Sequence, residues 1–192
     1  MSLRSFIALL FAAALVVIPA RADAASAPTG GTAYQTPPAT PKSTKSPGTA
    51  KRAQAPLPTA TVGDDGLAVA PAGAPPQVAA LIAAGNVIAS TPYRFGGGHG
   101  SFDDTAYDCS GSVSYALHGA GLLDATLDST GLSKWGLSGA GTWITIYANK
   151  THTYLIVAGV RFDTSGAKAA GSRWQAAPRS SKGFKVRHPD GL

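Results

Sequence analysis

The chain has 192 residues, of which 44% are apolar, 14% charged and 8% aromatic, and it contains one cysteine. This composition excludes a collagen-like, coiled-coil or multi-span membrane protein, and a single cysteine excludes an internal disulfide framework. The formal net charge is +6 without any glutamate, and the basic residues are scattered, so no nucleic-acid partner is expected. At roughly 100–200 residues per domain, the length allows one globular domain.

The first 24 residues have the pattern of an export signal. Arg4 precedes an unbroken apolar run of 13 residues, 6–18. This run is shorter than the roughly 20 residues that a membrane-spanning helix needs. Residues 20–22 (Ala-Arg-Ala) and 22–24 (Ala-Asp-Ala) offer the small-x-small pattern of a signal peptidase site. We therefore expect residues 1–24 to be a signal peptide. The mature protein would be secreted to the cell wall or periplasm, with no stable membrane anchor.

Residues 25–75 have the composition of a linker. Ten of the 14 prolines lie between Ser26 and Pro76, and threonine, alanine, serine and lysine fill most of the remainder. The segment has few large apolar residues and no apolar periodicity, so it is expected to be a disordered, extended spacer. The globular domain is then expected to span residues 76–192.

Residues 76–192 alternate between helical and strand patterns. Pro75-Pro76 precedes apolar residues at helical spacing, which predicts an amphipathic helix ending near Ser90. A glycine-rich loop at residues 96–100 separates it from a second predicted helix, Cys109–Ala120. Runs rich in β-branched and aromatic residues predict strands at residues 142–148, 152–158, 162–164 and 184–187. Helices followed by antiparallel strands are typical of an α+β fold.

Cys109 opens the second predicted helix. Its thiol would lie on the inward side of the helix, near Val113, where the positive end of the helix dipole favours the thiolate. The N–H groups of the same turn could hold a developing oxyanion. A reactive nucleophile and a buried, inert cysteine fit this position equally well.

A thiolate nucleophile needs a base, usually histidine, and the chain has four histidines. His118 lies about 180° round the helix from Cys109 and cannot be the partner. His188 is near the end of the chain in a charged segment, and His99 is in the glycine-rich loop, where it would face substrate or solvent. His152 opens a strand that would hold its side chain rigidly, which makes it the best candidate on geometry. No residue pair has structural-zinc spacing, so we expect neither a metal nor an organic cofactor.

Together these features resemble the NlpC-type cell-wall cysteine endopeptidases. The match comprises Pro-Tyr-Arg-Phe-Gly-Gly at residues 92–97, Asp-Cys-Ser-Gly at 108–111, a helix ending at 117–121, and His152 at the start of a strand. It covers residues 77–164. The four-residue motif is weak alone, whereas its position between the first motif and the histidine is specific.

The resemblance implies a papain-like α+β fold, with helices packed on a small antiparallel sheet. It implies cleavage of peptidoglycan stem peptides, usually between D-γ-glutamate and the diamino acid, by Cys109 as nucleophile and His152 as base. Tyr93 would hydrogen-bond near the thiol, and Asp108 and Ser110 would help to bind the N-terminal part of the stem. Peptidoglycan stem peptides are the expected partners, and the protein is expected to be a monomer.

The sequence departs from the family at the third catalytic position. The family has a polar residue there, often histidine, that orients the base. An ungapped alignment places Thr164 in this position, and Asp163 would face the other side of a regular strand. Aspartate orients an imidazolium more strongly because it accepts a charged hydrogen bond, and a β-bulge could turn it round. We predict Asp163 as the orienting residue, with Thr164 as the alternative.

Two other functions remain open from the sequence. A wall-binding module of the same fold with little turnover would account for the missing third histidine. A cysteine amidase that cuts between the glycan and the stem would use the same thiol chemistry on a different bond.

Overall fold

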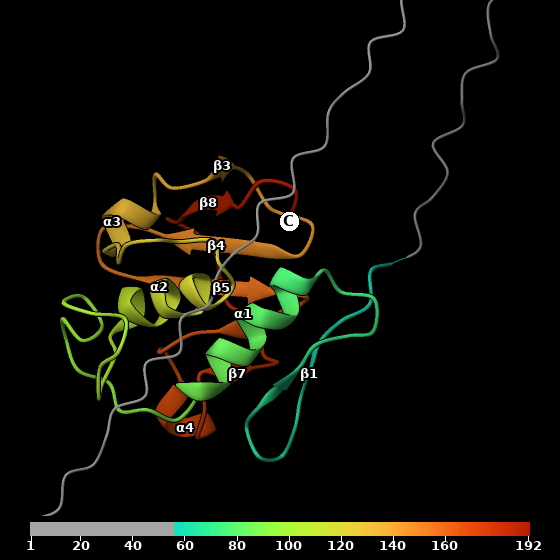
Figure 1. Cartoon of the computed structure of the whole chain (residues 1–192), viewed down its shortest axis with the longest axis horizontal. Coiled ribbons are helices and arrows are strands. Elements are labelled where there is room, and N and C mark those ends of the chain that lie inside the picture. Colours follow the sequence, from blue (N-terminus) through green and yellow to red (C-terminus); the bar gives the residue numbers. More distant parts are fainter. Residues whose placement is uncertain (1–55) are drawn as a thin grey trace, which may run out of the picture. The chain divides into compact units, whose positions relative to one another are not determined.

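The computed structural model describes residues 56–192 (Figure 1). The helices in this range are α1 (Pro76–Val87), α2 (Cys109–Gly119), α3 (Ser129–Leu132) and α4 (Ala167–Ala170). The strands are β1 (Thr61–Val62), β2 (Ala68–Val69), β3 (Leu137–Ser138), β4 (Ile144–Ala148), β5 (Thr153–Val157), β6 (Val160–Phe162), β7 (Trp174–Gln175) and β8 (Lys185–His188). The expected signal peptide and residues 25–55 of the expected linker lie outside the described residues. Among the helices of residues 56–192, none is long and apolar enough to cross a membrane.

The first long helix, α1, starts and ends close to the prediction. Pro76 occupies its first turn, where the missing N–H costs nothing and the fixed φ suits a helix. The helix ends at Val87, three residues before the predicted end. Its buried residues are Val78, Leu81, Ile82 and Gly85. Gly85 allows a close approach to Trp174, because a Cβ there would lie 2.5 Å from the Trp174 Cζ2 atom.

The second long helix, α2, packs against both α1 and the central strand β5. It runs from Cys109 to Gly119, within one residue of the prediction. The apolar face expected from the sequence is buried and consists of Val113, Ala116, Leu117 and Ala120. Asp108 precedes the helix in an extended conformation, and its side chain accepts a hydrogen bond from the Gly111 N–H. Aspartate at this position satisfies one of the free donors of the first turn, and the helix therefore begins at Cys109.

The main sheet has six strands in the order β3-β8-β4-β5-β6-β7, all antiparallel to their neighbours. Its centre is the β4–β5 hairpin, in which Tyr147 pairs with Tyr154. The predicted strands at 142–148, 152–158 and 184–187 correspond to β4, β5 and β8. The predicted strand at 162–164 is displaced, because β6 ends at Phe162 and the chain turns away after it. Helices α1 and α2 on this sheet confirm the α+β fold (Figure 1).

The segment 56–75, expected to be part of a disordered linker, is ordered and belongs to the domain. Its strands β1 and β2 form an antiparallel hairpin. Ala60 and Ala68 are buried in the core, and the Ala60 N–H donates to the Ala158 carbonyl at 2.8 Å. The Asn86 side chain bonds both the N–H and the C=O of Ala68, each at 2.9 Å. The ordered domain therefore begins at or before residue 56, and the expected boundary at residue 76 is wrong for this segment. Backbone hydrogen bonds and small buried alanines hold it, without the large apolar side chains that the prediction required.

Candidate active site

Cys109 is at the first position of α2 and is partly exposed. Two backbone donors of this turn are already occupied: the Gly111 N–H bonds the Asp108 carboxylate at 2.8 Å, and the Ser112 N–H bonds the Asp108 carbonyl at 3.0 Å. Within residues 56–192, the N–H groups of Cys109 and Ser110 have no hydrogen-bond acceptor. Two free donors therefore lie beside the sulfur, at the positive end of the helix.

The glycine-rich loop and the start of α2 are in close contact. A Cβ on Gly111 would lie 2.1 Å from the Gly97 carbonyl oxygen, and a Cβ on Gly97 would lie 2.3 Å from the carbonyl oxygen of Ala106. Any side chain at these two positions would push the loop away from the helix. The loop forms one wall of the site, and this contact explains why glycine follows Asp-Cys-Ser in the sequence.

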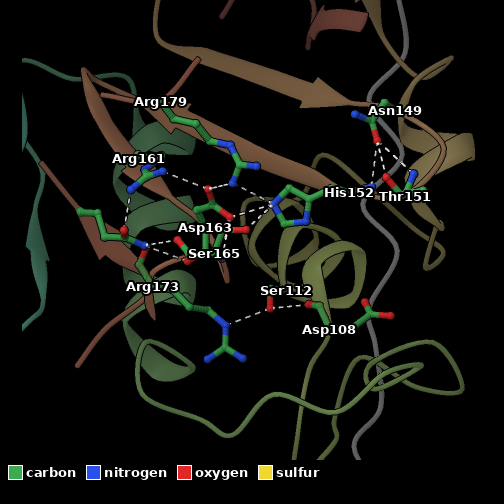
Figure 2. A network of polar contacts seen from close by, with 11 residues as sticks. Asp108, Ser112, Asn149, Thr151, His152, Arg161, Asp163, Ser165, Arg173 and Arg179 are labelled. Carbon is green, nitrogen blue, oxygen red and sulfur yellow. Dashed lines mark hydrogen bonds and ion pairs between the residues drawn. The ribbon is translucent and has the colours of Figure 1, made fainter. Parts of the chain in front are cut away.

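His152 immediately precedes β5, and its backbone is fixed by the turn that joins β4 to β5. The Asn149 side-chain oxygen accepts hydrogen bonds from the N–H groups of Thr151, at 2.9 Å, and of His152, at 3.0 Å. The His152 ring points from the start of β5 toward Asp163, and its Nε2 atom is 2.9 Å from the Asp163 Oδ1 atom (Figure 2). Because Nε2 faces the carboxylate, Nδ1 is the ring nitrogen left for the thiol.

Asp163 lies at the centre of a polar cluster and has a fully buried side chain. Besides His152, it accepts hydrogen bonds from the Arg179 Nη1 atom at 2.7 Å, the Arg161 Nη1 atom at 3.2 Å and the Ser165 N–H at 2.8 Å (Figure 2). Since β6 ends at Phe162, Asp163 is not constrained by strand alternation, and no bulge is needed to bring it to the histidine.

Within residues 56–192, the side chain of Thr164, the alternative orienting residue, makes no hydrogen bond to the imidazole. Its side chain lines a separate cavity of about 370 Å³ that also includes Pro92, Tyr93 and Lys168. The structure therefore brings Asp163, and not Thr164, into hydrogen-bond contact with His152.

The charges around His152 favour its protonated form. Burial opposes protonation, but the hydrogen bonds to Asp163 and then to Cys109 outweigh it and raise the pKa of His152 to about 9. Burial likewise opposes ionisation of Asp163, and the bond from His152 leads the interactions that hold the pKa of this carboxyl below its ordinary value. At neutral pH the pair is an imidazolium and a carboxylate.

The expected substrate-binding residues surround the thiol, but two of them are engaged internally. Asp108 is buried, and its carboxylate also accepts hydrogen bonds from the Gly96 N–H at 3.0 Å and contacts the His99 Nε2 atom at 3.0 Å. The Ser110 hydroxyl donates to Asp108 at 3.2 Å and is 3.1 Å from the same His99 nitrogen. Asp108 and Ser110 therefore hold the glycine-rich loop and the His99 side chain in place. The sequence predicted instead that His99 would face substrate or solvent.

Tyr93 is more than half exposed, at 59%, and lines the same cavity as Cys109. Burial raises the pKa of its hydroxyl, with the charges of Cys109 and Asp108 adding to the effect. In the described part of the chain its hydroxyl makes no hydrogen bond to the thiol. Tyr93 therefore shares a cavity with Cys109 but does not make the expected hydrogen bond.

An open cavity of about 520 Å³ lies over the sulfur. Its walls come from the loop after α1, the start of α2, the start of α3 and the β4–β5 turn. The residues that line it include Tyr93, Phe95, His99, Cys109, Ser110, Thr130, Lys150 and Thr151. Tyr93 also lines the smaller cavity beside Thr164, so it borders both cavities.

The remaining histidines are engaged elsewhere. The ring of His118 is stacked on Phe102 with centroids 3.7 Å apart, and its Nδ1 atom is 2.8 Å from the Leu123 carbonyl oxygen. The His188 Nδ1 atom is 3.0 Å from the carbonyl oxygen of Gly139.

Three arginines support the site, and none of them belongs to a recognisable motif. Arg161 lies inside the matched region, whereas Arg173 and Arg179 lie beyond it. Arg161 and Arg179 both bond Asp163. Arg173 is buried, and its guanidinium donates to the carbonyls of Ile88 and Thr91, each at 2.6 Å, and of Tyr107 at 3.2 Å. It also reaches α2 through the Ser112 hydroxyl at 3.0 Å. Nothing in the sequence around Arg173 indicates that it would be the donor that joins these loops.

The raised pKa of His152 predicts a pH-dependent stability. The group gains a partner on folding, so its contribution is complete below its ordinary value of 6.5 and disappears as pH rises through about 9. In a Cys109→Ala background, which removes both the thiol's own titration and its share of the raised pKa of His152, the stability advantage of His152 over His152→Gln should decrease by roughly 1–3 kcal/mol as pH rises from 6.5 toward 9. Urea unfolding at a series of pH values measures it. A pH-independent difference would show that the imidazole is not held as a cation.

Comparisons with known proteins identify a structural likeness. A scan against protein-family models finds no match, and a search of curated proteins also finds none. Among solved structures, the chain is similar to the peptidoglycan hydrolase RipB from Mycobacterium tuberculosis, with 23% sequence identity and a TM-score of 0.46. The match covers 58% of this chain and 64% of that chain, so it spans less than two thirds of the other chain's length. At this level of identity the likeness concerns the fold alone.

Proposed function

We propose that the protein is an exported cysteine hydrolase that cleaves the peptide stems of peptidoglycan, at the bond between D-γ-glutamate and the diamino acid. The observation that carries the proposal is the pairing of Cys109, at a helix start, with His152, held by the buried carboxylate of Asp163. A nucleophile, a base and an orienting acceptor are the three parts of a thiol acyl-transfer site. The substrate class is supported by the sequence resemblance around residues 92–97, 108–111 and 152.

In the first half of the reaction, the thiol proton is held on Nδ1 of His152 as part of the imidazolium, and the Cys109 thiolate attacks the γ-glutamyl carbonyl carbon. A carbon–sulfur bond forms, and the carbonyl electron pair becomes an oxyanion. The free N–H groups of Cys109 and Ser110 are the donors for this charge. The carbon–nitrogen bond then breaks, and the Nδ1 proton passes to the leaving amine nitrogen, which gives a thioester and a free amine.

In the second half, His152 removes a proton from a water molecule that attacks the thioester. The carbon–sulfur bond breaks and leaves the thiolate beside the reprotonated imidazolium, and the new γ-carboxyl group releases its remaining proton to solvent and departs as the carboxylate. Asp163 stays ionised throughout and holds Nε2–H, because its pKa lies below the ordinary value and its charge is matched by two arginines. Its role is to keep the imidazole in one orientation and one tautomer.

The substrate would lie in the open cavity above the sulfur. Tyr93 and Phe95 provide exposed aromatic surface at the rim, and Lys150 provides a cation. Asp108 and Ser110 contribute by fixing the loop that bears His99, so their effect on stem binding is indirect. Residues 1–24 would direct export and residues 25–55 would link the domain to its mature N-terminus, and the enzyme would act as a monomer.

The two rival functions differ from this proposal in measurable ways. A wall-binding module would retain peptidoglycan without cleaving it, and an amidase would release the whole stem from the glycan. The hydrogen-bonded His152–Asp163 pair favours catalysis over binding alone. A buried carboxylate is costly unless fixed partners satisfy it, and a binding module would have no need of such a pair beside the thiol.

Cys109→Ala tests the function. It removes one sulfur atom at a partly exposed position, so the fold should persist while stem cleavage is abolished. Mass spectrometry of defined muropeptides before and after incubation identifies both the loss and the bond. Wild-type turnover by the Ala variant would exclude thiol catalysis, and release of intact stems by the wild type would establish the amidase.

Asp163→Asn and Thr164→Val test the orienting residue. The Asn variant keeps the size of the side chain but can hold the wrong imidazole tautomer, and loss of an orienter costs up to about 10⁴-fold in kcat in a serine protease triad. Thr164→Val is nearly isosteric and should cost less than about threefold in kcat, because Thr164 does not contact the imidazole. Steady-state kinetics on one muropeptide compares the two. Equal, mild effects would mean that Asp163 does not orient His152.

A further inference from the structure

Arg179 lies between the catalytic pair and solvent, on the segment that follows β7. Its Nη1 atom is 2.7 Å from the Asp163 Oδ2 atom and 3.2 Å from the His152 Nε2 atom. Its guanidinium is also stacked against two aromatic rings, with its central carbon 5.1 Å from the Tyr154 ring centre and 5.5 Å from that of Phe184. Four side chains therefore surround this guanidinium beside the imidazole, and Figure 2 shows the two polar ones, Asp163 and His152.

Two arginines share one carboxylate with the histidine, but their surroundings differ. Arg161 is tied to the Gln175 side chain, and Gln175 in turn donates to the main-chain oxygens of Asp163 and Ser165. This makes Arg161 part of the fold behind Asp163. Arg179 is more exposed, at 25% against 11%, and is the arginine that reaches the histidine nitrogen itself.

Charged and titratable groups from several elements surround the His152 ring. Asp163 and Arg179 lie at Nε2, Cys109 lies toward the other ring nitrogen, and Tyr154 packs nearby on β5 with its ring centroid 6.4 Å away. Lys150 is two residues earlier on the same turn and lines the cavity. Arg179 is the cation closest to the imidazole among these groups, and a like charge at hydrogen-bond distance disfavours the imidazolium.

We propose that Arg179 is a positioning residue that competes with His152 for the Asp163 carboxylate and thereby makes the imidazolium a better proton donor to the leaving amine. The proposal rests on the proposed function, since it assigns a role in that same reaction. With Asp163 alone, the histidine would retain its proton too strongly to release it in the acylation step. Arg179 adds a second arginine to the partners of Asp163, at the side where His152 binds, and this keeps the imidazolium acidic enough to react.

Arg179→Met and Arg179→Lys, each in the Cys109→Ala background, test the proposal without any need for activity. NMR titration of the ring C–H signals, with His152 identified by comparison with His152→Gln, reports the pKa of this histidine directly. Arg179→Met should raise it by about one pH unit, because the neighbouring cation is lost. Arg179→Lys keeps the charge and should leave it nearly unchanged. Lys182→Met removes an exposed cation from the same segment and serves as the matched control, with no shift expected.

In the otherwise unsubstituted enzyme, Arg179→Met should lower kcat by up to about tenfold with KM unchanged and move the alkaline limb of the kcat profile upward. An unchanged or lowered pKa of His152 in Arg179→Met would overturn the proposal, as would an equal shift in Lys182→Met. If no variant cleaves a muropeptide, the proposed function fails while the titration still decides the effect of Arg179 on the imidazole.

Discussion

The structure depends on one buried carboxylate. Asp163 has no solvent-exposed side-chain surface, so its charge is tolerated only because four donors from three parts of the chain converge on it. His152 comes from the β4–β5 turn, Ser165 from the turn after β6, and Arg179 from the segment after β7. Satisfying this one group therefore fixes the His152 imidazole, closes the turn after β6 and anchors the segment between β7 and β8.

A second buried charge organises the other wall of the site. Arg173 has no carboxylate partner among the described residues, and hydrogen bonds to main-chain carbonyls stabilise its charge instead. Those carbonyls belong to the segment after α1 and to the residue just before the Asp108 cap. Arg173 also bonds Ser112 on the first turn of α2. The positions of the loop that carries Tyr93 and of the helix that carries Cys109 thus depend on the same guanidinium, and β7, which follows it, joins both to the sheet.

Much of this arrangement follows from local sequence, and the remainder does not. The two helices and the β4–β5 hairpin are visible because apolar periodicity and β-branched runs act over a few residues. The pairing of His152 with Asp163 was predicted from the preference of an imidazolium for a carboxylate, although the expected strand geometry was wrong because β6 ends at Phe162, two residues before the predicted end. The packing of the hairpin at residues 56–75 and the role of Arg173 were not predictable, since they arise from contacts between residues 61 to 106 positions apart. The role of Arg179 was not predictable either, because its contacts with Asp163 and His152 join separate elements 16 and 27 positions apart. Such contacts leave no periodic signal.

The central claim is that Cys109 and His152 react as a coupled pair. The single cysteine permits a direct test, because one alkylation of the intact protein by iodoacetamide reports on Cys109 alone, as a mass increase. At pH 6 the wild-type protein should be alkylated at least about tenfold faster than His152→Gln, since an imidazolium beside the sulfur attracts the negative charge of a thiolate and glutamine does not. Equal rates for the two proteins at this pH would contradict the account, because the thiol would then behave as an isolated cysteine at a helix end.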